Sequence, residues 1–394
     1  MRLFDSIGPR QPFSDQEQML VGAVRRLARD RFAHRAAAFD RSGDFPWPNI
    51  EDLNTLELNR ALLPPEHGGV EISYACYLTL VKEISMACAS TGIIWATNFH
   101  ASKPIVDAGN EQQKQRFLSI IARGGLGALA ITEPSGGSDA ATMETTFRPD
   151  GEAIVINGSK AFITNGDVAD LYLVFGRWTE IDDPRRALSA LVLPRGVPGL
   201  IIGRKEEKLG HRASSTVALA FDDCRVPRAN LLGAPGDGRQ ILLRALNTSR
   251  PSVAAQALGI ARAAFEDAVT AINQPRRSGQ RVVDFQGIQF MVADMAASLA
   301  LAENWMFHVA DLVEAGASDF SVEAAVLKLV ASDLAMEIAT NAVQLLGGAG
   351  YCADHRAERL FREAKVTQIW EGTNQIQRAY IGRAFATSKP GGRP

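Results

Sequence analysis

Four short segments of the sequence carry residue types that could hold a cofactor or move a proton. Residues 130–139 read AITEPSGGSD, where small residues let a ligand approach the backbone and hydroxyls offer hydrogen bonds. Residues 158–166 read GSKAFITNG, residues 344–351 read QLLGGAGY, and residues 369–378 read IWEGTNQIQR. Each segment taken alone is weak evidence, because a Gly- and Ser-rich stretch is more often an ordinary turn. Glu371 could act as a general base, but by itself it is better explained as a helix-terminal Glu in a surface salt bridge.

The elements that would position these segments follow the order helices, strands, helices. Ser14 and Glu17 have the spacing of a capping box, which predicts the start of a helix. Helical spacing resumes over residues 74–121, interrupted by a turn at Gly109 and Asn110. Amphipathic helices are predicted again over residues 254–272, 285–312, 322–346 and 357–365.

The middle of the chain has the character of a β-domain. Short runs of apolar and β-branched residues are separated by Gly, Pro and Asp. The pairs Asn157–Gly158 and Asn165–Gly166 predict tight hairpin turns, and therefore antiparallel strands. The expected domains are helical over residues 1–126, an antiparallel β-domain over 127–235, and a helical bundle over 236–394.

Composition excludes several classes of protein. The chain has 394 residues, with 42 Lys and Arg against 44 Asp and Glu, and this balance argues against a nucleic-acid-binding protein. A hydrophobic fraction of 46% excludes a highly charged disordered chain. No apolar run approaches the ~20 residues of a membrane span, and the N-terminus lacks a secretory signal. We therefore expect a soluble cytoplasmic protein with no membrane partner.

The cysteines point to neither a metal site nor a redox pair. Cys76, Cys88, Cys224 and Cys352 include no CxxC spacing. Ordinary reduced thiols are the expected state, and no metal is predicted.

Taken together, in this order and at these separations, the four segments resemble those of the acyl-CoA dehydrogenase family. The resemblance extends from the helix near Ser14 to Arg383. It implies an α+β fold with an N-terminal helical domain, a central antiparallel β-domain and a C-terminal four-helix bundle. It also implies non-covalent FAD, an acyl-CoA substrate, a homotetramer or sometimes a homodimer, and an electron-transfer flavoprotein as electron acceptor.

The reaction that the resemblance implies is α,β-dehydrogenation of an acyl thioester in fatty acid or amino acid catabolism. A carboxylate removes a proton from Cα while the hydride on Cβ moves to flavin N5. Glu371 matches the family's catalytic glutamate, and its backbone N–H with a flavin ribityl hydroxyl would polarise the thioester carbonyl. A branch of the family carries the base at the position of Ser249, which cannot serve as a carboxylate, so Glu371 is the candidate.

The resemblance also assigns cofactor contacts. Phe162 stands where the family often has Trp against the isoalloxazine, although core packing is an alternative reading. Pro275 replaces the family's pyrophosphate-binding arginine, and Arg276 or Arg277 could supply that charge. Gln344, Gly347, Gly348 and Gln286 match contacts made by a neighbouring subunit. The complete set of expected FAD contacts is Ile131, Thr132, Ser138, Phe162, Thr164, Arg276, Gln286, Gln344, Gly347, Gly348, Thr373 and Gln375.

The expected substrate contacts fall into two groups. Ser138, Asn247, Arg250 and Gly372 match the thioester and its carrier, and Asn247 replaces the usual Asp, so the carrier could be CoA or the phosphopantetheine arm of a carrier protein. Trp95, Phe99 and His100 would line the acyl pocket, and their bulk favours a short, branched or polar acyl group. Packing of these three residues between helices, with the pocket elsewhere, is an equal alternative.

Two further readings differ in chemistry. One is a divergent member of the family that uses oxygen directly or performs a non-oxidative reaction on an acyl thioester. The other is a flavin-poor binding protein that has kept the fold, which the Pro275 departure favours. The presence of the whole segment around Glu371 favours dehydrogenation.

Overall fold

The computed structural model describes residues 2–61, 63–139 and 143–386. By its internal contacts the chain divides into two units: Phe13–Ser249, and Arg250–Pro394 together with Met1–Pro12. The division leaves the early helices in one unit with the strands, so the predicted three-domain organisation stays a prediction.

Helices of the Phe13–Ser249 unit begin where the sequence places caps. Ser14 and Glu17 form the predicted capping box at the start of α2 (Asp15–Leu27), and a π-helical turn joins α2 to α3. Asn110 caps the helix that follows the predicted turn. The other helices of this unit are α3 (Ala33–Ser42), α4 (Trp47–Thr55), α5 (Tyr74–Ala87), α6 (Ala89–Ala108) and α7 (Glu111–Ala122).

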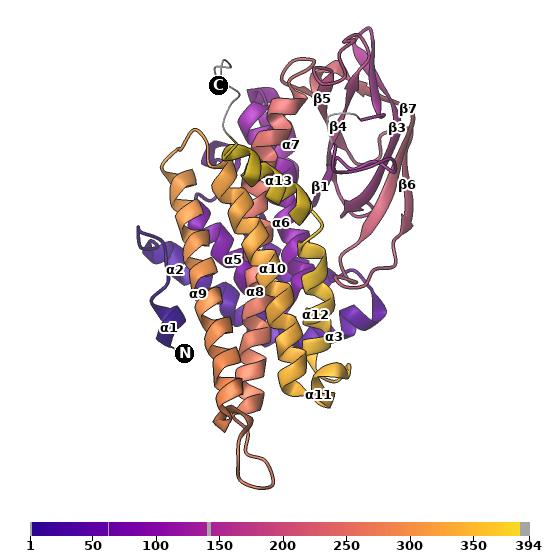
Figure 1. Ribbon diagram of the computed structural model, residues 1–394. Coiled ribbons are helices and arrows are strands. Elements are labelled where there is room, and N and C mark those ends of the chain that lie inside the picture. Colours follow the sequence, from indigo (N-terminus) through magenta and orange to yellow (C-terminus); the bar gives the residue numbers. More distant parts are fainter. Residues whose placement is uncertain (1, 62, 140–142, 387–394) are drawn as a thin grey trace. The chain divides into compact units, whose positions relative to one another are not determined.

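The strands of this unit form one mixed sheet (Figure 1). Its order is β6-β7-β3-β2-β4-β5-β8, with β1 paired to β4. The strands are β1 (Gly127–Ala130), β2 (Thr146–Asp150), β3 (Ala153–Thr164), β4 (Leu171–Trp178), β5 (Leu188–Pro194), β6 (Leu200–Lys205), β7 (Thr216–Pro227) and β8 (Leu231–Leu232).

The prediction of a wholly antiparallel sheet is wrong at β4, which runs parallel to β1 and β2. The cause is topological. Strand β3 returns antiparallel to β2, and β4 then takes the other side of β2, so β4 runs in the direction of β2.

The two Asn–Gly pairs do not form hairpins. Strand β3 continues through Asn157–Gly158, where its pairing with β7 shifts register. Gly158 has φ +138°, and a Cβ there would lie 2.7 Å from the Thr145 Cα, so glycine is needed for a bulge and close approach. Asn165 takes a left-handed conformation at the end of β3, but the next strand pairs with β2 instead of β3.

Helix α6 is tied to the start of β1 by buried amides. Asn98 Oδ1 accepts a hydrogen bond from the Gly127 N–H at 2.8 Å, and Asn165 Nδ2 donates to the carbonyls of Ile94 and Gly127. Both Asn side chains are buried. These contacts hold the predicted acyl-pocket helix beside the strand that leads into residues 131–139.

The second unit is a helical bundle (Figure 1). Long helices lie where the sequence predicts them, but α8 begins earlier than expected and α13 was not predicted. Arg262 on α8 reaches Glu303 on α9, and Arg356 on α12 pairs with Asp267 on α8 at 2.7 Å. The helices are α1 (Arg2–Asp5), α8 (Gly238–Ile272, from Arg250 in this unit), α9 (Gln286–Glu314), α10 (Ser321–Leu346), α11 (Gly348–Tyr351), α12 (Arg356–Thr367) and α13 (Asn374–Ala384).

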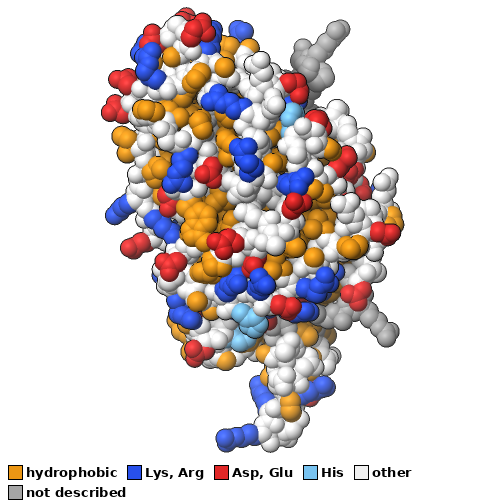
Figure 2. All heavy atoms as spheres, turned by 180° about the vertical axis from the view of Figure 1, so that it is seen from behind, with side chains coloured by type: hydrophobic (Ala, Val, Ile, Leu, Met, Phe, Trp, Pro, Cys, Tyr) orange, Lys and Arg blue, Asp and Glu red, His pale blue; other side chains and the backbone are white. Residues whose placement is uncertain are grey.

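Positive and negative side chains alternate over the face shown in Figure 2, as the near-neutral charge leads one to expect. Within the described ranges, no helix has both the length and the apolar character that crossing a membrane requires. Those ranges also contain no cluster of three or more His, Cys, Asp or Glu side chains suited to a metal ion.

Candidate active site

The segment with Glu371 is a left-handed turn between α12 and α13. Glu371 has φ +51° and Gly372 has φ +87°. The left-handed region costs a non-glycine residue about 1–2 kcal/mol, and such strain is found preferentially at functional sites. Thr373 ends the turn as the N-cap of α13, where its hydroxyl accepts the Ile376 N–H at 3.3 Å.

Two side chains hold the main chain of this turn. Gln377 Nε2 donates to the carbonyls of Glu371 and Gly372 at 3.1 and 3.0 Å. Lys328 Nζ, from α10, donates to the Gly372 carbonyl at 2.8 Å. Both side chains are fully buried. The turn is therefore held from the bundle interior, while the half-buried Glu371 side chain lies at its edge.

The charge of Glu371 acts on two buried cations, Arg250 and Lys328. Burial lowers the pKa of Arg250, and the charge of Glu371 opposes this shift. Burial also lowers the pKa of Lys328 to about 7, again against the charge of Glu371, while Arg250 lowers it further. Arg250, predicted for the substrate, and Glu371, predicted as the base, thus interact within one unit.

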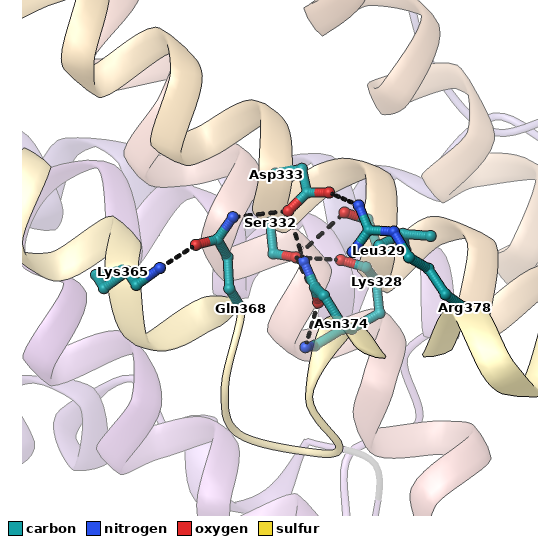
Figure 3. A network of polar contacts seen from close by, with 8 residues as sticks. All are labelled: Lys328, Leu329, Ser332, Asp333, Lys365, Gln368, Asn374 and Arg378. Carbon is teal, nitrogen blue, oxygen red and sulfur yellow. Dashed lines mark hydrogen bonds and ion pairs between the residues drawn. The ribbon is translucent and has the colours of Figure 1, made fainter. Parts of the chain in front are cut away.

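A polar network supports the start of α13 (Figure 3). Asn374 Oδ1 accepts from Lys328 Nζ at 2.8 Å and from Ser332 Oγ at 3.1 Å. Asn374 Nδ2 donates to Asp333 Oδ1 at 2.7 Å, and Asp333 also pairs with Arg378 at 2.6 Å. Lys328, Ser332 and Asp333 of α10 all bond Asn374, so α10 sets the place where α13 begins.

In the other unit, an ion pair underlies residues 131–139. Glu133 Oε1 accepts from Lys160 Nζ at 2.7 Å, and the Glu133 carboxylate also accepts from the backbone N–H groups of Glu144 and Thr145. Lys160 is fully buried and also donates to the Ile131 carbonyl. Burial alone would raise the pKa of Glu133, but the hydrogen bonds from Lys160 and Thr145 lower it. Burial lowers the pKa of Lys160 to about 8 against the opposing effect of Glu133.

This ion pair joins the two predicted cofactor segments. The Ala161 N–H donates to the Thr132 carbonyl at 2.8 Å, so the segments are neighbours. Ile131 and Thr132 are half-buried and Ser138 is exposed. A hollow of about 150 Å³ lies beside them, lined in part by Ile131, Glu133 and Gly136.

Phe162 stands out of the sheet on an irregularity of β3. The register with β7 shifts between Lys160 and Ile163, and Phe162 has φ +58°. Its side chain is 67% exposed. The alternative of core packing is therefore wrong for this residue, and Thr164 ends the same strand half-buried.

Five of the predicted FAD contacts of the bundle lie away from Glu371. Arg276 lies in the α8–α9 connection, Gln286 begins α9, Gln344 lies in the last turn of α10, Gly347 follows α10, and Gly348 begins α11. All five are exposed, as is Gln375 on α13. Figure 1 shows the α8–α9 connection and α11 at the lower end of the bundle and α13 across its upper end. Since Lys328 touches the Glu371 turn, Gln344 lies about 24 Å from it along α10.

The predicted acyl-pocket residues are packed among other aromatic side chains. Trp95, Phe99 and His100 on α6 are 4%, 7% and 4% exposed. The Phe99 ring lies 4.7 Å from the ring of Tyr77, which lies 5.4 Å from Trp95. A cavity of about 10 Å³ beside them has room for one water. In the same unit, Asn247 is half-buried and Ser249 is buried on α8.

Sequence reasoning missed the residues that support the site. Lys328, Asn374 and Gln377 hold the Glu371 turn, and Lys160 with Glu133 holds residues 131–139. One signal was available for Lys328, a single charge within the apolar run AAVLKLVA of residues 324–331. A charge on a buried helix face needs partners, but the sequence does not say which.

Comparison with known proteins finds relatives along nearly the whole chain. Family models described as the N-terminal, middle and C-terminal domains of acyl-CoA dehydrogenase match residues 14–125, 128–224 and 236–386. An acyl-CoA dehydrogenase of Bacillus subtilis is 41% identical over 93% of this chain and 97% of its own length. The mitochondrial short-chain specific acyl-CoA dehydrogenase of Mus musculus is 40% identical over 93% and 89%.

The fold has solved counterparts of the same kind. Butyryl-CoA dehydrogenase from Megasphaera elsdenii superimposes with a TM-score of 0.91 at 36% identity, covering 95% of this chain and 99% of that one. The predicted architecture of helices, central sheet and helices is thereby confirmed. Since sequence and fold agree along nearly the whole length, the chain belongs to the acyl-CoA dehydrogenase family and is an FAD-dependent oxidoreductase.

Proposed function

We propose that this enzyme dehydrogenates short-chain acyl-CoA thioesters between Cα and Cβ, with Glu371 as the base. The observation that carries the proposal is the left-handed Glu371–Gly372 turn, strained and held by buried Lys328 and Gln377. Relatives named short-chain specific acyl-CoA dehydrogenase and butyryl-CoA dehydrogenase support the substrate class.

The α-proton of a thioester is weakly acidic, so the reaction needs a base and a stabilised carbonyl oxygen together. Glu371 takes the proton from Cα on a carboxylate oxygen, and its backbone N–H donates to the thioester carbonyl. FAD, when bound, supplies at N5 the acceptor for the hydride that leaves Cβ. The Cα–Cβ double bond then forms from the electron pair of the broken Cα–H bond.

The residues present suit a flavin. Phe162 offers an exposed aromatic face, and stacking on an aromatic ring is favourable for a planar heterocycle. Thr132, Ser138 and Thr164 offer hydroxyls on the same unit, with Ile131 beside them. At the end of α10, a Cβ at Gly347 or Gly348 would meet nothing within 4 Å, which leaves room for the cofactor's nucleotide end.

We further propose that a second copy of the chain completes each cofactor site. Gln344, Gly347, Gly348, Arg276 and Gln286 lie at one end of the bundle and Glu371, Thr373 and Gln375 at the other. Because the two groups lie at opposite ends of one bundle, contacts from both groups to a single FAD would come from two subunits. Exposed apolar side chains on α9, including Phe290 and Leu301, support a homo-oligomer, dimeric or tetrameric.

The substrate carrier and the electron acceptor follow from the same proposal. Arg250 and Gly372 are assigned to the thioester region, with Ser138 and Asn247 toward the carrier. The names of the relatives favour CoA over a carrier-protein arm. The reduced cofactor would pass its electrons to an electron-transfer flavoprotein.

A panel of acyl-CoA thioesters with an artificial electron acceptor tests the substrate class. We expect kcat/KM for butyryl-CoA to exceed that for palmitoyl-CoA by at least about 100-fold, because Trp95, Phe99 and Tyr77 pack with little free volume between them. Anaerobic butyryl-CoA should also bleach the flavin band. Faster turnover of palmitoyl-CoA would contradict the short-chain assignment, and purification without flavin would favour the binding-protein alternative.

Phe162→Ala should weaken FAD binding without destabilising the fold. The ring is 67% exposed, so its loss removes little packing, whereas loss of an aromatic contact to the cofactor costs about tenfold in affinity. Titration of apoprotein with FAD, followed by flavin fluorescence, measures the change. Ile201→Ala, at a 53% exposed position on β6, is the matched control. Equal FAD affinities for Phe162→Ala and the wild type would remove Phe162 from the cofactor site.

A further inference from the structure

Lys328 is a buried lysine whose amine is directed at the catalytic turn. Its Nζ donates to the Gly372 carbonyl and to Asn374 Oδ1, each at 2.8 Å. Buried lysines usually face a carboxylate. Here both acceptors are neutral, and both belong to the residues that follow Glu371.

The two hydrogen bonds bracket Thr373. On one side, Gly372 carries the left-handed backbone that presents Glu371. On the other, Asn374 begins α13, and its amide is joined to Ser332 and Asp333 (Figure 3). One amine from α10 thus fixes both ends of the turn, because it holds the last residue before the cap and the first residue after it.

These two hydrogen bonds, called here the Lys328 clamp, oppose the relaxation that a strained turn would otherwise undergo. Glu371 has a left-handed φ although it is not glycine, so its conformation persists only where the surroundings enforce it. Displacement of a reacting group by 1 Å can cost about 100-fold in rate. A side chain that touches neither substrate nor cofactor can therefore control the rate through this turn.

We propose that Lys328 is a positioning residue for dehydrogenation, which sets the place of the Glu371 carboxylate and backbone N–H through its hydrogen bonds to Gly372 and Asn374. The inference rests on the proposed role of Glu371 as the base. It assigns to α10 a function in the chemical step that neither the family resemblance nor the charge pattern indicates.

The clamp requires hydrogen bonds but no positive charge. Burial lowers the pKa of Lys328 to about 7, while the charges of Glu371 and Asp333 oppose the shift and Arg250 adds to it. A neutral amine still has two N–H donors for its two acceptors. Both hydrogen bonds, and with them the geometry of the turn, are therefore retained whether the Lys328 amine is charged or neutral.

The test is Lys328→Met in the FAD-loaded enzyme, with Lys114→Met on α7 as the matched control. Lys114 is half-buried and pairs with Glu111 of the same helix, and neither residue belongs to the network of Figure 3. We expect kcat for butyryl-CoA to fall about 100-fold with KM changed less than threefold and flavin content unchanged. Hydrogen exchange, measured by mass spectrometry, should become faster in the peptide around residues 369–378 and stay unchanged in the sheet.

Asn374→Ala removes one of the two acceptors of Lys328 and keeps the proposal falsifiable if Lys328→Met does not fold, since it should lower kcat in the same way. Where both single variants fold, the double variant of Lys328→Met with Asn374→Ala is a second test. Because both residues act through one turn, the double variant should lose about as much kcat as the worse single variant. If the losses in kcat of the two single variants multiply in the double variant, or if hydrogen exchange becomes faster throughout the protein, Lys328 has a general structural role and the proposal is overturned. A Lys328→Met enzyme with kcat within threefold of wild type would also overturn it.

Glu371→Gln separates this proposal from the proposed function. An active Glu371→Gln enzyme removes the base assignment and the positioning role with it. An inactive Glu371→Gln enzyme together with a fully active Lys328→Met enzyme overturns the positioning role alone.

Discussion

Glu371→Gln should reduce the rate of flavin bleaching by butyryl-CoA by about 10⁴-fold, the upper range for loss of a general base. The substitution replaces a carboxylate that can accept a proton with an amide of the same shape that cannot. The turn should survive, because Gln377 and Lys328 bind the main-chain carbonyls of residues 371 and 372. FAD should therefore remain bound, and the protein should remain yellow.

Anaerobic stopped-flow absorbance of the bound flavin measures this directly, since it follows proton and hydride removal without the electron acceptor. Glu337→Gln, at an exposed position on α10, is the control with the same change in charge and should bleach at the wild-type rate. Bleaching by Glu371→Gln within tenfold of wild type would require another base. Loss of the yellow colour would instead make Glu371 a structural residue of the cofactor site.

Local rules of the sequence predict the ends of helices well. The capping box predicted at Ser14 depends on residues three apart, and it forms. Asn110, predicted only as part of a turn, caps the helix that follows that turn. The same kind of rule fails at Asn157–Gly158, where a hairpin was expected. There the pairing of β3 with β7, more than fifty residues later in the chain, holds the strand extended through the glycine. Tertiary pairing overrides a turn preference when the partner strand is long.

The supporting residues of the site were beyond prediction for a related reason. Glu371 could be named because a family motif surrounds it. Lys328 meets Gly372 only when α10 packs against the α12–α13 connection, and Lys160 meets Glu133 only across the sheet. A lysine in an apolar run indicates a buried cation, but the group that accepts its hydrogen bond lies tens of residues away in the sequence. Partner choice across such separations is a property of the fold.

The alternating direction of the helices explains why the predicted FAD contacts do not gather in one place within the bundle. Antiparallel helices bring every second connection to the same end. The α8–α9 connection and the end of α10 therefore share one end, and the Glu371 turn takes the other (Figure 1). The family resemblance assigns Gln286 and the contacts after α10 to a neighbouring subunit, and the lengths of α9 and α10 keep these residues away from the Glu371 turn of the same bundle.

Glu133→Gln should be the most destabilising of the substitutions considered, because it removes the carboxylate that faces the fully buried Lys160. Breaking a buried ion pair on one side costs about 3–5 kcal/mol. Glu133 also binds the N–H groups of Glu144 and Thr145, so residues 131–139 should loosen and FAD binding should weaken with them. We expect a fall in Tm of roughly 5–10 °C, measured by circular dichroism on apoprotein and on FAD-loaded protein.

Two further variants distinguish the effect on Tm of breaking the ion pair from the effect of removing any carboxylate. Glu144→Gln changes an exposed carboxylate whose residue binds Glu133 only through its backbone N–H, and it should change Tm little. The double variant Glu133→Gln with Lys160→Met should be more stable than Glu133→Gln alone, because it removes the buried cation together with its partner. If the double variant were less stable than either single variant, the two side chains would contribute independently and the ion pair would not be what holds residues 131–139. Recovery of Tm without recovery of FAD affinity would instead show that the carboxylate positions the cofactor segment as well as balancing Lys160.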